Sequence, residues 1–178
     1  MSFTQIYKTP AEFSDLVLCS DGEFLTGLCF AGSRDAAKLR GSCTDAALPV
    51  FEETAAWLDV YFRGAMPDFV PKYALPDCTP FRREVTEILC TIPYGETVTY
   101  GEIARQLAGR RGVERMSAQA VGGAVGFNPL YLLVPCHRVM GANGALTGYG
   151  GGLSNKIALL KLEGHDVSRF TLPSAIRR

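Results

Sequence analysis

Three helix-start signals divide the second half of the chain into short helices, and they restrict its fold more than any other sequence feature. Thr79-Pro80 combines an N-cap residue with a proline at the first helical position. Thr99 and Glu102 have the spacing of a capping box, and Ser117 is a further N-cap residue. The predicted helices are residues 80–91, 100–108 and 118–127.

The second and third predicted helices resemble a helix-turn-helix, although the connector at residues 109–117 is longer than the usual tight turn. The third helix has almost no large side chains, and its glycines each cost about 1 kcal/mol relative to alanine. Close approach of another backbone can offset this cost. That backbone can belong to a neighbouring helix or to the wall of a DNA groove, and the spacing alone favours packing inside the protein.

The first part of the chain has the pattern of a small α/β unit. Two apolar runs, residues 16–20 and 24–30, flank Asp21-Gly22 and predict a β-hairpin. Residues 50–63 have the apolar spacing of an amphipathic helix, which Gly64 ends.

These patterns together predict the fold class and the domain organisation. We expect an α/β N-terminal subdomain over residues 1–75, made of a small antiparallel sheet and a helix. A mostly helical C-terminal domain with a helix-turn-helix-like element follows over residues 76–178. The connection at residues 65–79 is short and apolar, so we expect the two parts to pack together.

Charge is distributed unevenly although the net charge is zero. Residues 1–79 hold 6 Lys/Arg and 11 Asp/Glu, whereas residues 80–178 hold 12 and 7. A basic second half indicates a polyanionic partner for that half, with a chance division of solvated charges as the alternative. No apolar run is long enough to span a bilayer and no signal peptide is evident, so we expect a cytoplasmic protein without a membrane partner.

The six cysteines do not predict a disulfide framework or a metal site. None forms a C-x-x-C pair, and only two histidines are present, so a closed zinc site has no signature here. The apolar residues 130–134 predict a buried strand that leads into Cys136-His137. Neighbouring strand residues point to opposite faces, so His137 can serve the thiol only if the chain bends or a water bridges them. As a dipeptide, Cys-His is more often structural than catalytic.

The segment Pro135-Cys136-His137-Arg138-Val139 resembles the active-site signature of the O6-alkylguanine-DNA alkyltransferases, also called methylated-DNA–protein-cysteine methyltransferases. The resemblance continues in consistent order from Phe81 to His165. Its other blocks are residues 92–97, 100–104, 120–122, 128–129, 149–153, 156, 159–160 and 163–165.

The resemblance implies a role for each matching residue. Cys136 would accept the alkyl group, His137 would act as a base through a water, and Glu163 would orient that imidazole. Tyr100 would crowd the DNA backbone and donate a proton to the departing base. Asn128 would join the DNA-binding helix to the active-site loop.

Further residues are implied in two surfaces. The DNA-binding residues would be Ala118, Gln119, Ala120, Gly122, Gly123, Arg105 and Arg115, with Arg110 and Arg111 also available for phosphates. The substrate pocket would be lined by Val125, Tyr131, Val139, Tyr149 and Gly150. Arg138 and Lys156 are expected to be structural or to face phosphates.

The resemblance implies repair of double-stranded DNA that contains O6-alkylguanine, and also O4-alkylthymine, by base flipping and one irreversible transfer to Cys136. It implies neither a metal nor a cofactor, and no obligate protein partner, so a monomer is expected. One position departs from the family: Gln119 stands where the best-known members have an arginine that fills the gap left by the flipped base. We interpret Gln119 as a neutral wedge with weaker duplex affinity.

Three other functions fit parts of the sequence. A non-enzymatic damage sensor of the same fold would lack the acceptor cysteine, which is present here. A transcriptional regulator would need base-reading side chains on the third helix, which has few. A cysteine hydrolase would need an oxyanion hole that the sequence does not indicate.

Overall fold

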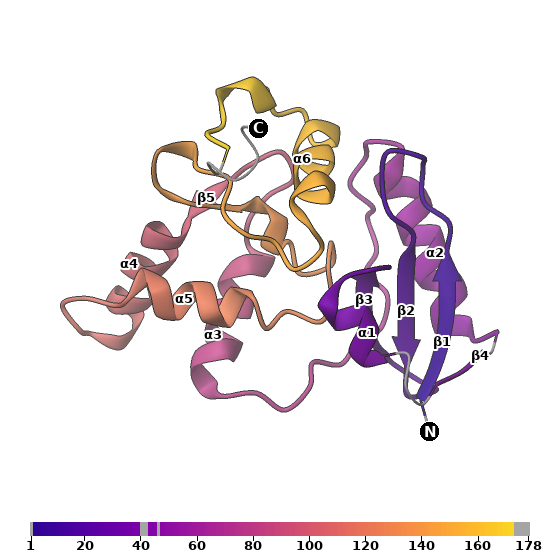
Figure 1. The fold of residues 1–178 in the computed structure, drawn as a ribbon. Helices are drawn as coiled ribbons and strands as arrows, with labels where there is room; N and C mark the ends of the chain where they lie inside the picture. The colour runs from indigo at the N-terminus through magenta and orange to yellow at the C-terminus, as the bar shows by residue number, and fades with distance from the viewer. Residues whose placement is uncertain (1, 40–42, 46, 173–178) are drawn as a thin grey trace.

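The N-terminal part of the chain forms a four-stranded sheet made of β1 (Ser2–Tyr7), β2 (Leu16–Ser20), β3 (Leu25–Phe30) and β4 (Cys43–Asp45). The computed structural model describes residues 2–39, 43–45 and 47–172. The strand order is β3-β2-β1-β4; the first three strands are antiparallel, and β4 runs parallel to β1 (Figure 1). Two helices accompany the sheet, α1 (Arg34–Leu39) and α2 (Pro49–Phe62).

The predicted hairpin and helix of this part are confirmed. The Asp21 carboxylate accepts hydrogen bonds from the backbone N–H groups of Glu23 and Phe24, at 2.9 and 2.8 Å, and Gly22 supplies the positive φ of the turn. α2 buries Phe51, Trp57 and Leu58, and it packs against β2. β1 and β4 have no counterpart among the elements predicted from the sequence.

The second part of the chain is mostly helical, as predicted. It contains α3 (Pro80–Cys90), α4 (Tyr100–Arg111), α5 (Ala118–Val125) and α6 (Leu153–Leu162), with a short parallel pair formed by β5 (Val98–Thr99) and β6 (Val139–Met140). α3, α4 and α5 pack against one another, and α4 and α5 form the helix-turn-helix-like element (Figure 1). The predicted fold class is therefore confirmed.

The three predicted helix starts are confirmed, because each N-cap side chain accepts a hydrogen bond from a backbone N–H of the first turn. The Thr79 and Ser117 side chains accept from the N–H groups of Arg82 and Ala120. Both halves of the Thr99 capping box are formed. The helix ends differ from the prediction: α4 continues to Arg111, where Gly112 in the left-handed region ends it, and α5 already ends at Val125.

The predicted strand over residues 130–134 is wrong. Leu132 has φ 72°, and the N–H of Val134 donates to the carbonyl of Leu130 at 2.9 Å, so the segment folds back as a tight turn. The Asn128 side chain stabilises this turn, because its amide donates to the Val134 carbonyl and its oxygen accepts from the Leu130 N–H. Apolar composition alone did not distinguish a buried turn from a buried strand.

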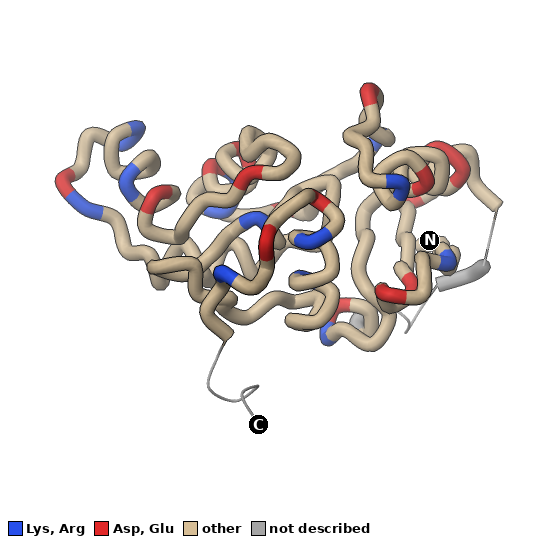
Figure 2. The backbone as a smooth tube through the Cα atoms, turned by 90° about the horizontal axis from the view of Figure 1, so that it is seen from above, with Lys and Arg blue, Asp and Glu red and all other residues tan. Residues whose placement is uncertain are grey.

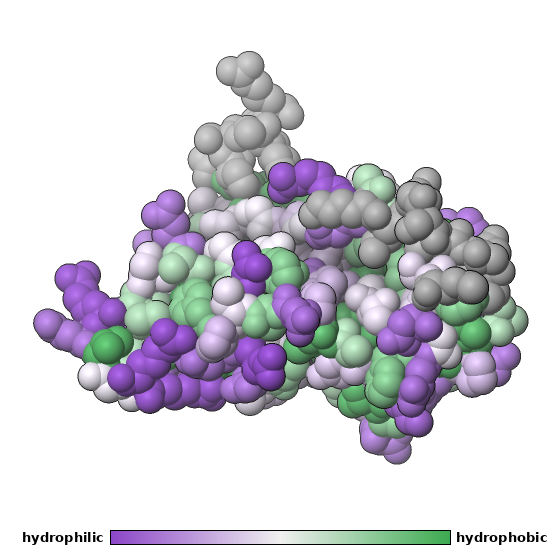
Figure 3. All heavy atoms as spheres, turned by 90° about the horizontal axis from the view of Figure 1, so that it is seen from below, coloured by the Kyte–Doolittle hydropathy of each residue, from purple (hydrophilic) through white to green (hydrophobic). Residues whose placement is uncertain are grey.

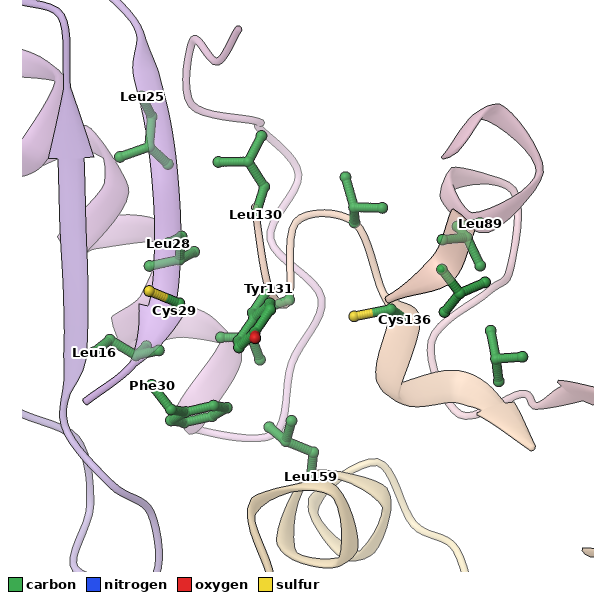
Figure 4. Close-up of a cluster of buried hydrophobic side chains, with 14 of the residues drawn as sticks. Leu16, Leu25, Leu28, Cys29, Phe30, Leu89, Leu130, Tyr131, Cys136 and Leu159 are labelled. Carbon is green, nitrogen blue, oxygen red and sulfur yellow. The ribbon is translucent and has the colours of Figure 1, made fainter. Parts of the chain in front are cut away.

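The two parts meet along the free edge of β3. The Leu28 N–H donates to the Pro129 carbonyl at 2.8 Å, and the Tyr131 N–H donates to the Leu28 carbonyl at 2.7 Å. One hydrophobic core continues across the junction, with Tyr131 between Phe30 of the sheet and Cys136 (Figure 4). The domain boundary at residue 75 stays a prediction. No helix within the described ranges is long and apolar enough to cross a membrane.

Candidate active site

Cys136 lies buried at the start of a 3-10 turn, Cys136–Arg138, and not on a strand. The chain therefore bends at the Cys-His pair, which meets the condition under which His137 can serve the thiol. The Asn128 amide donates to the Cys136 sulfur at 3.0 Å, and its other bonds fix it to the turn before the thiol. Asn128 thus links the end of α5 to the sulfur.

The thiol is protonated at neutral pH. Burial raises the pKa of Cys136 to about 11, although the hydrogen bond from Asn128 and the charge of Lys156 act to lower it. A thiolate is the reactive form of cysteine, so any nucleophilic reaction here requires a base that removes the proton.

His137 has the properties of such a base. Its Nε2 lies 2.8 Å from Glu163 Oε1, and beside a carboxylate this nitrogen carries the proton. Within the described residues the buried Nδ1 atom has no hydrogen-bond partner, so its lone pair is available. Burial lowers the pKa of His137 more than the Glu163 carboxylate raises it, and the imidazole is therefore neutral.

Glu163 is the most heavily hydrogen-bonded group of the site. Arg138 donates to it from Nε and Nη2, both at 2.9 Å, and Gly95 donates its backbone N–H at 3.2 Å. The Tyr61 hydroxyl from α2 also donates to Oε1, at 2.6 Å. Burial acts to raise the pKa of Glu163, but the bonds and charges of His137 and Arg138 outweigh it and hold that pKa well below its usual range.

Two basic residues near the site are structural. Arg138 is buried against Glu163 and the Ile92 carbonyl, and Lys156 is buried and donates to the Val139 carbonyl at 2.6 Å. Neither can face a phosphate, so that alternative is excluded by burial.

A small cavity opens beside the Cys136 sulfur. Its lining includes four of the five residues expected for the pocket, Val125, Tyr131, Tyr149 and Gly150. The other lining residues are Tyr100, Asn128, Cys136, Gly122, Gly126 and Gly148. We expected Val139 in this lining, and that was wrong. Val139 is fully buried and pairs with Val98 in the short β5–β6 sheet.

The loop at residues 148–152 packs too tightly for side chains. A Cβ on Gly150 would collide with the Tyr131 hydroxyl, and one on Gly151 would lie 2.6 Å from the Phe30 ring. The Tyr131 hydroxyl in turn donates to Asp35 of α1 at 2.8 Å. The N-terminal sheet and α1 thus support one wall of the cavity from behind.

α5 presents a surface of small residues to solvent. Ala118, Gln119, Ala120 and Gly123 are exposed, whereas Val121, Ala124 and Val125 are buried. A Cβ on Gly123 would meet no atom within 4 Å, and one on Gly122 would meet only the Tyr100 ring, at 3.8 Å. Packing inside the protein therefore does not explain these glycines, contrary to the expectation from spacing.

Basic groups surround this surface at one end of the molecule. Arg105 on α4 and Arg115 on the connector are exposed. Basic positions, all of them arginines, lie along α4 and the connector in Figure 2, and hydrophilic side chains project from the same end in Figure 3. Two other arginines are already paired: Arg111 forms a bidentate contact with Glu84, both bonds at 2.9 Å, and Arg110 lies 3.8 Å from Glu87.

The chain matches a known family and known relatives. The family model described as "6-O-methylguanine DNA methyltransferase, DNA binding domain" matches residues 80–165. The methylated-DNA–protein-cysteine methyltransferase of Mycobacterium leprae is 50% identical over 117 residues, which cover 66% of this chain and 67% of that protein. The Haemophilus influenzae protein of the same name is 38% identical over 162 residues, covering 90% of this chain and 87% of that one.

Solved structures agree with this match. The crystal structure of Mycobacterium tuberculosis O6-methylguanine methyltransferase superimposes with a TM-score of 0.77 at 38% identity, covering 96% of both chains. A structure of Mycobacterium tuberculosis OGT in complex with DNA gives a TM-score of 0.74 at 39% identity, covering 95% of this chain and 94% of that one.

Proposed function

The chain belongs to the methylated-DNA–protein-cysteine methyltransferase family, and on this premise we propose that it moves the alkyl group of O6-alkylguanine in DNA onto Cys136. Family membership supports DNA repair by a methyltransferase that acts on alkylated DNA. The observation that carries the proposal is the buried thiol beside a neutral imidazole whose Nδ1 is free to accept a proton.

The proposed transfer begins with the removal of the thiol proton. A water between the sulfur and Nδ1 passes this proton to His137, and Glu163 stabilises the resulting imidazolium. The sulfur then attacks the alkyl carbon, forming a C–S bond as the C–O6 bond breaks, and the bonding pair leaves with the guanine. A proton must reach the departing base, and we propose that Tyr100, which lines the cavity, donates it.

Tyr100 suits this role because its phenol is neutral. Burial raises the pKa of Tyr100, although a hydrogen bond with Thr147 acts to lower it. After transfer, the proton held by the imidazolium returns to the tyrosine through solvent. The product is a thioether, which has no easy hydrolysis route, so each molecule is expected to act once.

The reacting base must leave the duplex, because the sulfur lies below the protein surface. We infer that the small residues of α5 enter the minor groove and that Arg105 and Arg115 contact phosphates. The cavity beside the thiol measures about 50 Å³, much less than typical ligand pockets of roughly 300 Å³. A base can therefore enter only if the cavity widens, and we propose that the loop at residues 148–152 shifts to allow this.

Gln119 is exposed near the start of α5, where a side chain can enter the gap left by the flipped base. We propose that it acts there as a neutral wedge, which hydrogen-bonds the orphaned base without adding charge. Gln119→Arg should tighten duplex binding and speed repair. Gln106→Arg, which lies on α4 and not on α5, is the control for the added charge. A Gln119→Arg protein that binds and repairs like the parent would refute the wedge.

The experiment that tests the function is a titration with excess duplex DNA carrying O6-methylguanine, followed by intact mass. We expect a gain of one methyl group per protein molecule and then no further reaction. Tight binding without mass gain would indicate a damage sensor, and repeated turnover would indicate a hydrolase. The same titration with O4-methylthymine tests whether that base is also a substrate, as we propose.

A further inference from the structure

We propose that Tyr61, from the N-terminal α2, is a positioning residue for the alkyl transfer, which it serves by hydrogen-bonding the same Glu163 oxygen that His137 uses. This inference rests on the proposed function, because it concerns the same acceptor site. Tyr61 lies outside residues 80–165, which match the family's DNA-binding domain. It therefore gives the N-terminal part a role in the reaction beyond packing.

The Tyr61 hydroxyl shares one oxygen with the catalytic imidazole. It donates to Glu163 Oε1 at 2.6 Å, and His137 Nε2 lies 2.8 Å from that same oxygen. The hydroxyl is also 3.3 Å from Nε2, so the three atoms form a closed triangle. A change in the Tyr61 hydroxyl must therefore alter the carboxylate that the imidazole uses.

The tyrosine ring is held firmly in the core. Tyr61 is fully buried, with its ring stacked on Trp57 at a centroid distance of 5.3 Å and an interplanar angle of 10°. Phe62 and Tyr94 contact it edge-on, at 5.7 and 5.9 Å. These contacts fix the ring without the hydroxyl, so phenylalanine can fill the same space.

The hydroxyl acts on Glu163 as a neutral donor. Burial and the negative charge of Glu163 raise the pKa of Tyr61 well above its ordinary value, so it does not ionise at working pH. Its hydrogen bond withdraws electron density from Oε1 and so limits how strongly Glu163 attracts a proton on His137. This effect acts in the same direction as burial, which lowers the pKa of His137 most, so the imidazole stays neutral at rest and keeps Nδ1 ready for the thiol proton.

Other charged groups face this imidazole as well. Lys156 approaches it from α6, Glu163 from the position directly after that helix, Arg138 from its own turn, and Tyr61 from α2, with the Cys136 thiol beside it. Arg138 and Lys156 both act to lower the pKa of His137, and only Glu163 acts to raise it. Loss of the Tyr61 hydrogen bond leaves Glu163 Oε1 a stronger acceptor for His137, so the pKa of His137 should rise.

The test is the pH dependence of single-turnover methyl transfer at saturating DNA, comparing the full-length protein with Tyr61→Phe. The reaction amplitude counts competent molecules, and the rate constant reports the chemistry. We expect the acidic midpoint to rise by on the order of one pH unit, with the rate below it about tenfold lower and DNA affinity unchanged. Tyr7→Phe is the matched control, because it removes a hydroxyl bond to Asp59 of the same helix, far from Glu163.

A double-mutant cycle shows whether Tyr61 acts through Glu163. If it does, Tyr61→Phe should change nothing further in a Glu163→Gln background. The proposal is overturned if Tyr61→Phe gives the parental pH profile and rate, or if its effect persists in that background. Should Tyr61→Phe not fold, 3-fluorotyrosine at position 61 supplies a stronger donor, and an unmoved midpoint there would equally refute it. A parent protein that accepts no methyl group would instead refute the proposed function.

Discussion

Replacing Asn128 with alanine should damage both the stability of the protein and the reactivity of its thiol. The buried amide donates to the Val134 carbonyl at 2.8 Å and to the Cys136 sulfur at 3.0 Å, and its oxygen accepts from the Leu130 N–H at 2.9 Å. No solvent reaches this position to replace these bonds, since Asn128 is only 5% exposed.

The expected cost follows from what each partner loses. The Leu130 N–H is left buried without an acceptor, which costs about 1–3 kcal/mol. The Val134 carbonyl retains the Cys136 N–H as a donor, so its loss is about 0.5–1.5 kcal/mol. The free energy of unfolding should therefore fall by roughly 2–4 kcal/mol. The thiol loses a donor that favours its ionised form, so transfer should slow by about tenfold.

Urea unfolding and single-turnover transfer measure the two effects separately. Thr54→Val is the control, because Thr54 is also buried and its hydroxyl donates to the Val50 carbonyl at 2.7 Å within α2. It should lose stability through a broken buried hydrogen bond while the pKa of the Cys136 thiol stays the same. Equal transfer rates for the two variants, or an unchanged stability of Asn128→Ala, would refute the reasoning.

Three further predictions follow from the site. The pKa of Glu163 is lowered in the folded state, so the charge of Glu163 contributes fully to the free energy of unfolding above pH 4.5 and this contribution is lost as the pH falls below that value. The free energy of unfolding of Glu163→Gln should therefore fall less steeply with decreasing pH than that of the parent. Burial raises the pKa of Cys136 to about 11, so iodoacetamide should alkylate this thiol slowly in the folded protein at neutral pH and faster up to about pH 11. The rate is followed on the Cys136 peptide after digestion, and a rate that levels off near pH 8 would contradict this. Gly123→Ala should stabilise α5 by about 1 kcal/mol in urea unfolding yet weaken duplex binding, since a Cβ there meets no protein atom; unchanged DNA affinity would argue against contact at this face.

Local signals predicted much of the fold because they act through neighbouring residues. The caps at Thr79, Thr99 and Ser117 and the Asp21-Gly22 turn all depend on bonds within a few residues. β1 escaped prediction because its stability comes from pairing with β2, and its exposure does not alternate. The turn at Leu132 depends on Asn128 and on the edge of β3, neither of which an apolar run reveals.

The site residues that could be predicted are those whose type is fixed by the chemistry. Residues that reach the site through packing of the fold could not be predicted. Resemblance identified Cys136, His137 and Glu163, and the structure brings the last two into contact. Tyr61 was not predicted as a site residue because it occupies an apolar position of its helix. The available signal was its hydroxyl, since a buried tyrosine hydroxyl needs a hydrogen-bond partner. Arg111 was expected to be free for phosphates, but Glu84 lies one helix away and pairs with it.

The most direct test of the account is to locate the transferred group. The parent protein and Cys136→Ser are each incubated with O6-methylguanine duplex, digested, and mapped by tandem mass spectrometry. We predict S-methylcysteine at position 136 in the parent, no methylated peptide in Cys136→Ser, and guanine restored in the DNA only by the parent. Methylation at another cysteine, or repair that survives Cys136→Ser, would contradict the account.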